Sequence, residues 1–214
     1  MSVRKDVSTW MWMRRCRFGS TVAGGEEGGW MGEGKTPRRP QHHDAQARRV
    51  VTGVNAAGRS YIESDELTPH RFVGAGTTKC DLWRFSSLPS EILPGDGIEP
   101  GRVQTVPSRG GLVIRLTTFP PDAEWDRAQG YWDSTGRLST GNADFDDEGI
   151  PGLHVTDTVD TLTIVSGELW CVLQDGEVLL RPGDTIVQRG TKHAWSNRTS
   201  GVVVALSVMV SAQR

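Results

Sequence analysis

The last third of the chain is a succession of short apolar runs separated by turns of only a few residues. TLTIVS is followed by Gly167, and ELWCVLQ runs into Asp175-Gly176, a dipeptide that favours a two-residue hairpin turn. EVLL, TIVQRGT, HAWSN and VVVALSVMV follow, and RPGD supplies the next turn. Short strands at such close spacing are typical of a β-sandwich or a β-barrel.

The preceding part of the chain reads as β structure as well. ARRVVTGVN and RSYIES are β-prone, and CDLWRF and GLVIRLTTF follow after turn-rich segments. A long polar loop covers 120–152, and loops of that length in compact domains are usually functional or mobile. No run has a convincing helical pattern, so we expect one all-β domain over 46–214, a size that suits a single core.

Residues 1–45 differ from the rest of the chain. This segment is rich in glycine and charge and has little to bury, so we expect it to be a disordered extension. Met11, Met13 and Met31 are alternative starts, and part of the extension could be a gene-model artefact. The net charge of −2 gives no nucleic-acid footprint.

Cysteine content and hydropathy indicate the cellular compartment of the protein. The 3 cysteines are widely spaced and suggest neither a disulfide framework nor a CxxC metal site, which favours a reducing compartment. No run approaches the roughly 18 apolar residues of a membrane span, and the first residues lack the apolar core of a secretory signal. We therefore expect a cytoplasmic protein that does not bind membranes.

Two stretches, HVTDTVDTLTIVSGE and RPGDTIVQRGTKHAWSN, resemble the paired motifs of the cupins, which are small jelly-roll β-barrels. In the first motif His154 stands at the first histidine, Asp160 at the glutamate and Gly167 at the closing glycine. In the second motif the matching residues are Gly183, Gly190, His193 and Asn197. The resemblance is strong over 149–210, and over 47–120 it extends only to further strands of the same barrel.

The sequence departs from the cupin motifs at two places. Thr156 stands where the second histidine is expected, and Gln188 replaces the proline of the second motif. The stretch from Gly183 to His193 is one residue shorter than in the family.

The resemblance implies a metal site built from His154, His193 and Asp160. Two histidines and one carboxylate leave coordination positions open and suit non-haem Fe(II), with zinc or manganese as alternatives. Thr156 could hydrogen-bond a metal-bound water, and Gln188 could supply an amide oxygen. His193, Asp160 and Thr156 are therefore the candidate catalytic residues.

Strand periodicity is consistent with this site, because alternate residues share a face. If His154 points into the barrel, so do Thr156, Thr158 and Asp160. If His193 points inward, so do Trp195 and Asn197, which become candidate substrate-binding residues together with Gln188. Asp157 lies on the opposite face and is the weaker candidate. We expect Cys171 to be an unreactive core residue.

Other interpretations remain open for the same residues. His154 and His193 could be hydrogen-bonded barrel histidines, and Asp160 could bond backbone amides, which would leave a metal-free relative. Arg115 interrupts the apolar run GLVIRLTTF. It could bind a substrate carboxylate or phenolate at the barrel mouth, although a solvated charge on the outer face is the more ordinary interpretation.

The wider pattern is similar to small single-domain cupins found beside bacterial catabolic enzymes and in fungal secondary-metabolite clusters. The resemblance implies an oxidoreductase or related tailoring enzyme for a small aromatic or polyketide-derived compound. Fold alone does not fix function, and two alternatives remain. One is a non-catalytic small-molecule-binding cupin; the other is a metal-independent isomerase or decarboxylase that uses His193 and Asp160. We also expect a homodimer in which the RRVVTG strand covers a barrel edge.

Overall fold

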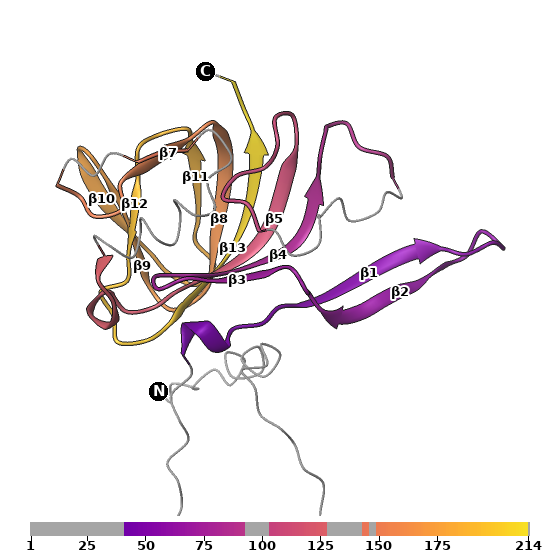
Figure 1. Ribbon diagram of the computed structural model, residues 1–214, viewed down its shortest axis with the longest axis horizontal. Coiled ribbons are helices and arrows are strands. Elements are labelled where there is room, and N and C mark those ends of the chain that lie inside the picture. The colour runs from indigo at the N-terminus through magenta and orange to yellow at the C-terminus, as the bar shows by residue number, and fades with distance from the viewer. Residues whose placement is uncertain (1–40, 93–102, 128–142, 146–148, 214) are drawn as a thin grey trace, which may run out of the picture.

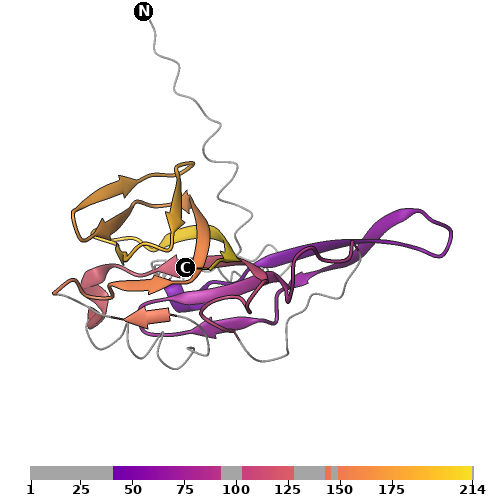
Figure 2. The same ribbon diagram turned by 90° about the horizontal axis from the view of Figure 1, so that it is seen from above.

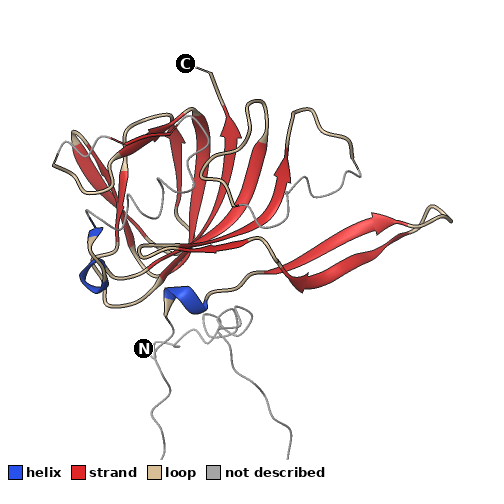
Figure 3. Cartoon of the chain, viewed as in Figure 1, coloured by secondary structure: helices blue, strands red, loops and turns tan. Residues whose placement is uncertain are grey.

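The computed structural model describes residues 41–92, 103–127, 143–145 and 149–213, shown in colour in Figure 1. Helical structure in these ranges consists of two single-turn 3-10 helices, η2 (His42–Asp44) and η3 (Asp122–Glu124), and the remaining elements are strands (Figure 3). No helix in the described ranges has the length and apolar character needed to cross a bilayer. The all-β prediction is confirmed, whereas residues 1–40 of the expected extension lie outside the described residues.

The strands of the described ranges form four antiparallel sheets. Their bounds are β1 (Arg48–Val54), β2 (Ser60–Leu67), β3 (Arg71–Val73), β4 (Thr78–Phe85), β5 (Leu112–Phe119), β6 (Ala143–Phe145), β7 (His154–Thr156), β8 (Thr158–Ser166), β9 (Leu169–Leu173), β10 (Gly176–Leu180), β11 (Thr185–Arg189), β12 (Ala194–Ser196) and β13 (Val203–Ser211). The largest sheet has the order β11-β8-β13-β5-β4-β3, and a smaller one has the order β10-β9-β12. The other two sheets are the pairs β1-β2 and β6-β7.

The six-stranded sheet curves around the three-stranded one and closes a jelly-roll barrel (Figures 1 and 2). Strand β8 shows why the sequence adopts this arrangement: Thr158, Asp160, Leu162 and Ile164 are buried, and the residues between them are more exposed. The apolar core lies between the sheets and consists of Phe119, Leu162, Ile164, Leu169, Cys171, Leu180, Trp195, Val203 and Ala205. The cupin-type barrel expected from the sequence is therefore confirmed.

Tight turns connect the barrel strands. Gly167 has a φ of +82° between β8 and β9, and a Cβ atom there would lie 2.9 Å from a methyl group of Val203. The predicted hairpin after β9 is present, but its register differs by one residue. Gly176 already pairs with Leu173, so the loop residues are Gln174 and Asp175.

The β1-β2 hairpin projects away from the barrel (Figures 1 and 2). Both strands were predicted, but they form a separate two-stranded sheet instead of joining the six-stranded one. At the tip of the hairpin the Asn55 carboxamide oxygen accepts hydrogen bonds from the backbone N–H groups of Ala57 and Arg59. At its base Arg48 binds both carboxylate oxygens of Asp65.

The segment just before β1 packs against the barrel. Ala45 and Ala47 are buried, and the backbone oxygen of Ala45 accepts a hydrogen bond of 2.8 Å from Arg71 Nε. The backbone oxygen of His42 accepts a hydrogen bond from the Thr118 hydroxyl on β5. Residues 41–45, assigned to the disordered extension from their composition, thus make contacts with strands of the barrel.

Candidate functional site

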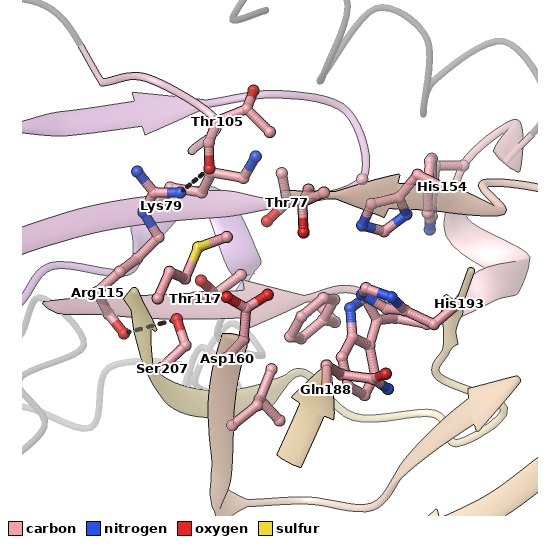
Figure 4. A pocket seen from close by; sticks show the side chains of 17 residues that line it. Thr77, Lys79, Thr105, Arg115, Thr117, His154, Asp160, Gln188, His193 and Ser207 are labelled. Carbon is pink, nitrogen blue, oxygen red and sulfur yellow. Dashed lines mark hydrogen bonds between the residues drawn. The ribbon is translucent and has the colours of Figure 1, made fainter. Parts of the chain in front are cut away.

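The barrel contains a partly open cavity of about 100 Å³ (Figure 4). Side chains from β4, β5, β7, β8, β11 and β12 contribute to its walls. Seven of the predicted site residues are among those that line it, namely Arg115, His154, Thr156, Asp160, Gln188, His193 and Trp195. The fold therefore brings these seven residues together around one cavity.

His154 and His193 face each other at one end of this cavity (Figure 4). Their backbones form an antiparallel bridge, because each N–H donates to the carbonyl oxygen of the other residue, at 3.0 and 2.9 Å. The bridge joins β7 to the residue just before β12 and sets the two imidazole centroids 4.4 Å apart. Two histidines that are distant in sequence thus form one pair.

Burial disfavours the charged form of both imidazoles of this pair. Burial, followed by the proximity of His193, lowers the pKa of His154 to about 3, and burial also lowers the pKa of His193. Nδ1 of His154 lies 2.8 Å from the Gly152 carbonyl oxygen, and Nδ1 of His193 lies 2.9 Å from that of Thr191. A carbonyl can only accept, so each Nδ1 carries the proton and each Nε2 keeps a lone pair.

Asp160, the third residue of the predicted metal site, does not form a metal-binding group with His154 and His193 in the described ranges. In the described ranges, no group of three or more histidine, cysteine, aspartate or glutamate side chains is placed to hold a metal ion. Neutral imidazoles anchored through Nδ1 are suitable metal ligands, but two of them do not make the predicted two-histidine, one-carboxylate centre. The three residues share the cavity without forming that centre.

Asp160 projects from β8 into the middle of the cavity (Figure 4). Its Oδ1 atom is buried and has no hydrogen-bond partner among the described residues. Burial raises the pKa of this carboxyl to about 6, although a hydrogen bond from Thr158 and the charge of Arg115 act in the opposite direction. An unsatisfied buried carboxyl is costly, so Asp160 is poised to accept a hydrogen bond or a proton from a molecule in the cavity.

Gln188 and Thr156 line the cavity near Asp160, but their polar atoms already have partners. The Gln188 amide donates to Cys171 Sγ at 3.0 Å and accepts a hydrogen bond from the Thr191 hydroxyl. The Thr156 hydroxyl lies 2.6 Å from that of Thr158. Burial raises the pKa of Cys171 to about 11, which confirms the expected unreactive core thiol.

Trp195 and Asn197 follow His193 in sequence and have different roles. Trp195 forms a wall of the cavity, with its ring edge-on to His193 at 5.4 Å and tilted against Phe119 at 6.1 Å. Asn197 is buried outside the cavity lining. Its amide nitrogen donates to the carbonyl oxygens of Phe119 and Gly201 at 3.0 and 2.6 Å. The predicted substrate contact of Asn197 is therefore wrong, because its side chain closes the turn after β12.

Arg115 is 2% exposed, so the interpretation as a solvated surface charge is wrong. Its Nε donates to Asp81 Oδ1 at 2.5 Å, and its two terminal nitrogens donate to the carbonyl oxygens of Thr105 and Gln104. Each nitrogen of the guanidinium is thus engaged in holding residues 104–105 against the barrel. Substrate binding by Arg115 remains a prediction.

Comparisons with known proteins agree with this geometry. No protein-family model matches the sequence. The chain is 26% identical over 169 residues to the cupin-domain-containing oxidoreductase srdD of Neurospora crassa, a match that covers 77% of this chain and 73% of that protein. It is 29% identical over 168 residues to the cupin-domain-containing oxidoreductase fogC of Aspergillus ruber, covering 74% and 70%. The chain belongs to the cupin superfamily.

Two further comparisons concern this cupin. Over 89 residues it is 46% identical to the oryzines biosynthesis cluster protein J of Aspergillus oryzae, a match that covers 41% of this chain and 35% of that protein. A solved cupin superfamily protein from Desulfitobacterium hafniense has a TM-score of 0.34 and 13% identity, and the match covers 65% and 82% of the two chains.

The cavity of this cupin also contains polar residues that sequence reasoning missed. Lys79, Thr77 and Thr105 line it near Arg115 (Figure 4). A signal for Lys79 exists in the sequence, because Lys79 and Asp81 alternate along β4 and therefore share a face. Two charges on one face of an otherwise apolar barrel strand suggest an interior polar site.

Proposed function

We propose that this cupin is an oxidoreductase that modifies a small aromatic or polyketide-derived compound in a secondary-metabolite pathway. The names of srdD and fogC support the reaction class, and that of the oryzines cluster protein supports the biosynthetic setting. The partly open cavity with aromatic walls at Phe119 and Trp195 suits a small planar molecule.

The observation that carries this proposal is the pair of neutral imidazoles at the cavity end. Each Nε2 lone pair can accept a proton, and the backbone bridge fixes the two rings relative to each other. A substrate C–H or O–H group placed between His154 and His193 would meet two bases that need no deprotonation beforehand. Removal of such a proton is a step common to the oxidation of alcohols and of activated carbon centres, in which the electron pair of the broken C–H bond passes to a separate two-electron acceptor such as O2 or a nicotinamide or flavin cosubstrate.

The other cavity residues would position the substrate for that step. Trp195 would pack against a ring of the substrate and exclude water, and Asp160 would accept a hydrogen bond from a hydroxyl group. These roles concern the protein side chains, and metal binding by His154, His193 and Asp160 stays a prediction.

A metal-independent isomerase is the second candidate, and the geometry of the acidic residue favours it. Asp160 and His193 line the same cavity without forming a metal-binding group with His154. Because its pKa is raised to about 6, Asp160 can return a proton that an imidazole has removed. The net result would be a shifted double bond with no change in composition.

Mass spectrometry of the pathway product separates these candidates. The purified protein is incubated with extracts of a host that expresses the neighbouring biosynthetic genes without it, and the metabolites consumed and formed are compared. An oxidoreductase produces a compound that differs by two hydrogen atoms or by oxygen, whereas an isomerase produces one of the same mass. The same reaction is run with His154→Ala and His193→Ala, and with His43→Ala as a control at an exposed site outside the cavity lining.

Loss of turnover in both cavity variants, with full activity in His43→Ala, is the expected result. Turnover that survives both substitutions would remove the imidazole pair from the mechanism. Saturable binding of a metabolite without any mass or structural change would show a binding protein instead of an enzyme.

A further inference from the structure

The end of the cavity opposite the imidazoles carries an excess of buried positive charge. Lys79 and Arg115 line this end, and Arg84, which is buried outside the lining, binds the same Asp81 as Arg115; we call these three side chains of β4 and β5 the cationic cluster. Figure 4 shows Lys79 and Arg115 on the left, and His154 and His193 on the right. Burial removes the hydration of an ion, and an oppositely charged partner compensates for that loss. Buried charges are therefore normally paired.

One carboxylate neutralises part of this cluster. Asp81 is fully buried and binds both arginines, through Oδ1 to Arg115 Nε and through Oδ2 to Arg84 at 3.1 Å. Asp160 lies across the cavity, and even if its charge is counted the cations remain in excess. The hydrogen bonds and ion pairs of the described residues do not include Lys79 Nζ, and no interaction is drawn at this side chain in Figure 4.

Two hydroxyl groups beside Lys79 also lack partners. The Oγ1 atoms of Thr77 and Thr105 are buried, line the same cavity and make no hydrogen bond among the described residues. A hydroxyl can donate to an anion, and a lysine ammonium provides three donors. One amine and two hydroxyls without hydrogen-bond partners among the described residues therefore belong to the lining of one cavity.

We propose that the cationic cluster is a binding site for the carboxylate group of a small organic acid, with Lys79 as its ion-pair partner and Thr77 and Thr105 as hydrogen-bond donors. The inference rests on the proposed function, in that it places the substrate in this cavity and makes it a carboxylic acid. Arg115 contributes positive charge, and each of its three nitrogens already donates one hydrogen bond, to Asp81 or to the carbonyl oxygens of residues 104–105.

The protonation of Lys79 is consistent with this role. Burial, followed by the charge of Arg115, lowers the pKa of the amine to about 7, whereas Asp81 raises it. An arriving carboxylate would stabilise the ammonium form and restore the charge that burial disfavours. The Lys79 amine can therefore become an ion-pair partner when a carboxylic acid binds in the cavity.

The test uses benzoate as the probe and benzamide as its neutral isostere. Isothermal titration calorimetry measures both ligands on the full chain and on Lys79→Met, which keeps the apolar length of the side chain without its charge. Arg59→Met makes the same change of net charge at an exposed site at the tip of the β1-β2 hairpin. Thr77→Val is a second variant that removes a hydroxyl with little change in volume. Melting temperatures report whether each variant is folded.

We expect benzoate to bind at least about tenfold more tightly than benzamide, as a charge-assisted hydrogen bond allows. Lys79→Met should lose at least about tenfold in benzoate affinity, Thr77→Val should lose about threefold or more, and Arg59→Met should bind as the parent does. Equal affinities for the two ligands, an unchanged benzoate affinity in folded Lys79→Met, or no benzoate binding at millimolar concentration would each overturn the inference.

The result is separable from that of the proposed function. His154→Ala and His193→Ala are expected to lose turnover but to keep benzoate binding, because the imidazoles lie at the other end of the cavity. Benzoate binding without imidazole-dependent turnover would leave the carboxylate site standing and reject the catalytic proposal. Imidazole-dependent turnover with no preference for benzoate would reject the carboxylate site alone.

Discussion

His154 and His193 exchange a pair of backbone hydrogen bonds, and this exchange fixes their imidazoles 4.4 Å apart in the cavity wall. The main chain, rather than the side chains, therefore sets the separation of the two rings. Because each Nδ1 is turned toward a carbonyl oxygen, the lone pair of each neutral ring lies on its Nε2 atom.

Replacing either histidine should abolish turnover without unfolding the barrel. We expect His154→Ala and His193→Ala each to lower the rate by about 100-fold or more, the usual cost of removing a general base. The initial rate of product formation measured by mass spectrometry checks this prediction. A rate within a few fold of the parent in either variant would contradict it, provided that His43→Ala behaves as the parent does.

Metal binding should follow the imidazole pair and not Asp160. The protein is stripped of metal, titrated with Fe(II) under anaerobic conditions or with Zn²⁺, and the bound metal is measured by elemental analysis after dialysis. We expect any retained metal to be lost in His154→Ala and His193→Ala and to change by no more than about twofold in Asp160→Ala, because metal affinity depends on the groups that coordinate the ion. Equal losses in all three variants would restore the ligand set predicted from the sequence.

The buried amine of Lys79 should make stability depend on pH. Its pKa is about 7 in the folded chain and 10.5 for a solvated lysine, so between these limits the unfolded chain binds a proton that the folded chain does not. The free energy of unfolding should therefore rise as the pH increases from about 7 toward 10.5. Arg115 and Asp81 are the charged neighbours of this amine; the charge of Arg115 lowers its pKa and that of Asp81 raises it.

Lys79→Met tests the pH dependence directly. The variant should be more stable than the parent at pH 6, by a few kcal/mol at most, and its advantage should shrink toward pH 10. Urea unfolding at these two values measures the difference. An advantage that is the same at both values would assign it to packing and not to the charge.

The ion pairs of Asp81 should contribute strongly to the stability of the barrel. Asp81→Asn removes the partner of two buried arginines, so we expect a loss of about 3–5 kcal/mol in the free energy of unfolding. Arg48→Ala breaks an exposed pair on the β1-β2 hairpin and should have little effect. Urea unfolding of both variants compares them, and a loss below about 1 kcal/mol for Asp81→Asn would contradict the prediction.

The β1-β2 hairpin should pair two copies of the chain. In the part of the chain that the structure describes, its strands pair with each other alone, and isolated two-stranded hairpins are marginally stable. Its exposed apolar residues are Val50, Val54, Tyr61, Ile62 and Leu67. A second copy would satisfy the open edges and cover these side chains.

Sedimentation velocity tests this dimer. We expect the parent to sediment as a dimer and Ile62→Lys, which places a charge at a position 63% exposed in the single chain, to be a monomer. Val187→Lys makes the same change at a comparably exposed position on β11 and should remain dimeric. A monomeric parent at micromolar concentration would end the proposal.

The barrel could be predicted because its pattern is local. Alternation along β8 and the glycines at its turns give the inward face and the strand boundaries without knowledge of the partner strands. The roles of Asn197 and Arg115 could not be predicted, because their partners are remote. Asn197 donates to the carbonyl oxygen of Phe119, 78 positions away, and Arg115 to the carboxylate of Asp81, 34 positions away.

The residues of the predicted metal site show a second limit of prediction from strand periodicity. Alternation correctly placed His154, Thr156 and Asp160 on the cavity side, but a shared face does not fix a distance. The strand is interrupted at Asp157, between β7 and β8, and Asp160 lies beyond that break. Lys79 was missed for a related reason, since its neighbours across the sheet belong to β5 and only the fold shows that they share a cavity.

The cationic cluster and the imidazole pair lie at opposite ends of one small cavity, so their separation should select substrates by length. A compound anchored at one end presents a reactive atom at the other only if its skeleton has the matching length. Homologous acids that differ by one methylene unit should then differ in their rate of turnover. Neither end of the cavity could produce this selectivity alone.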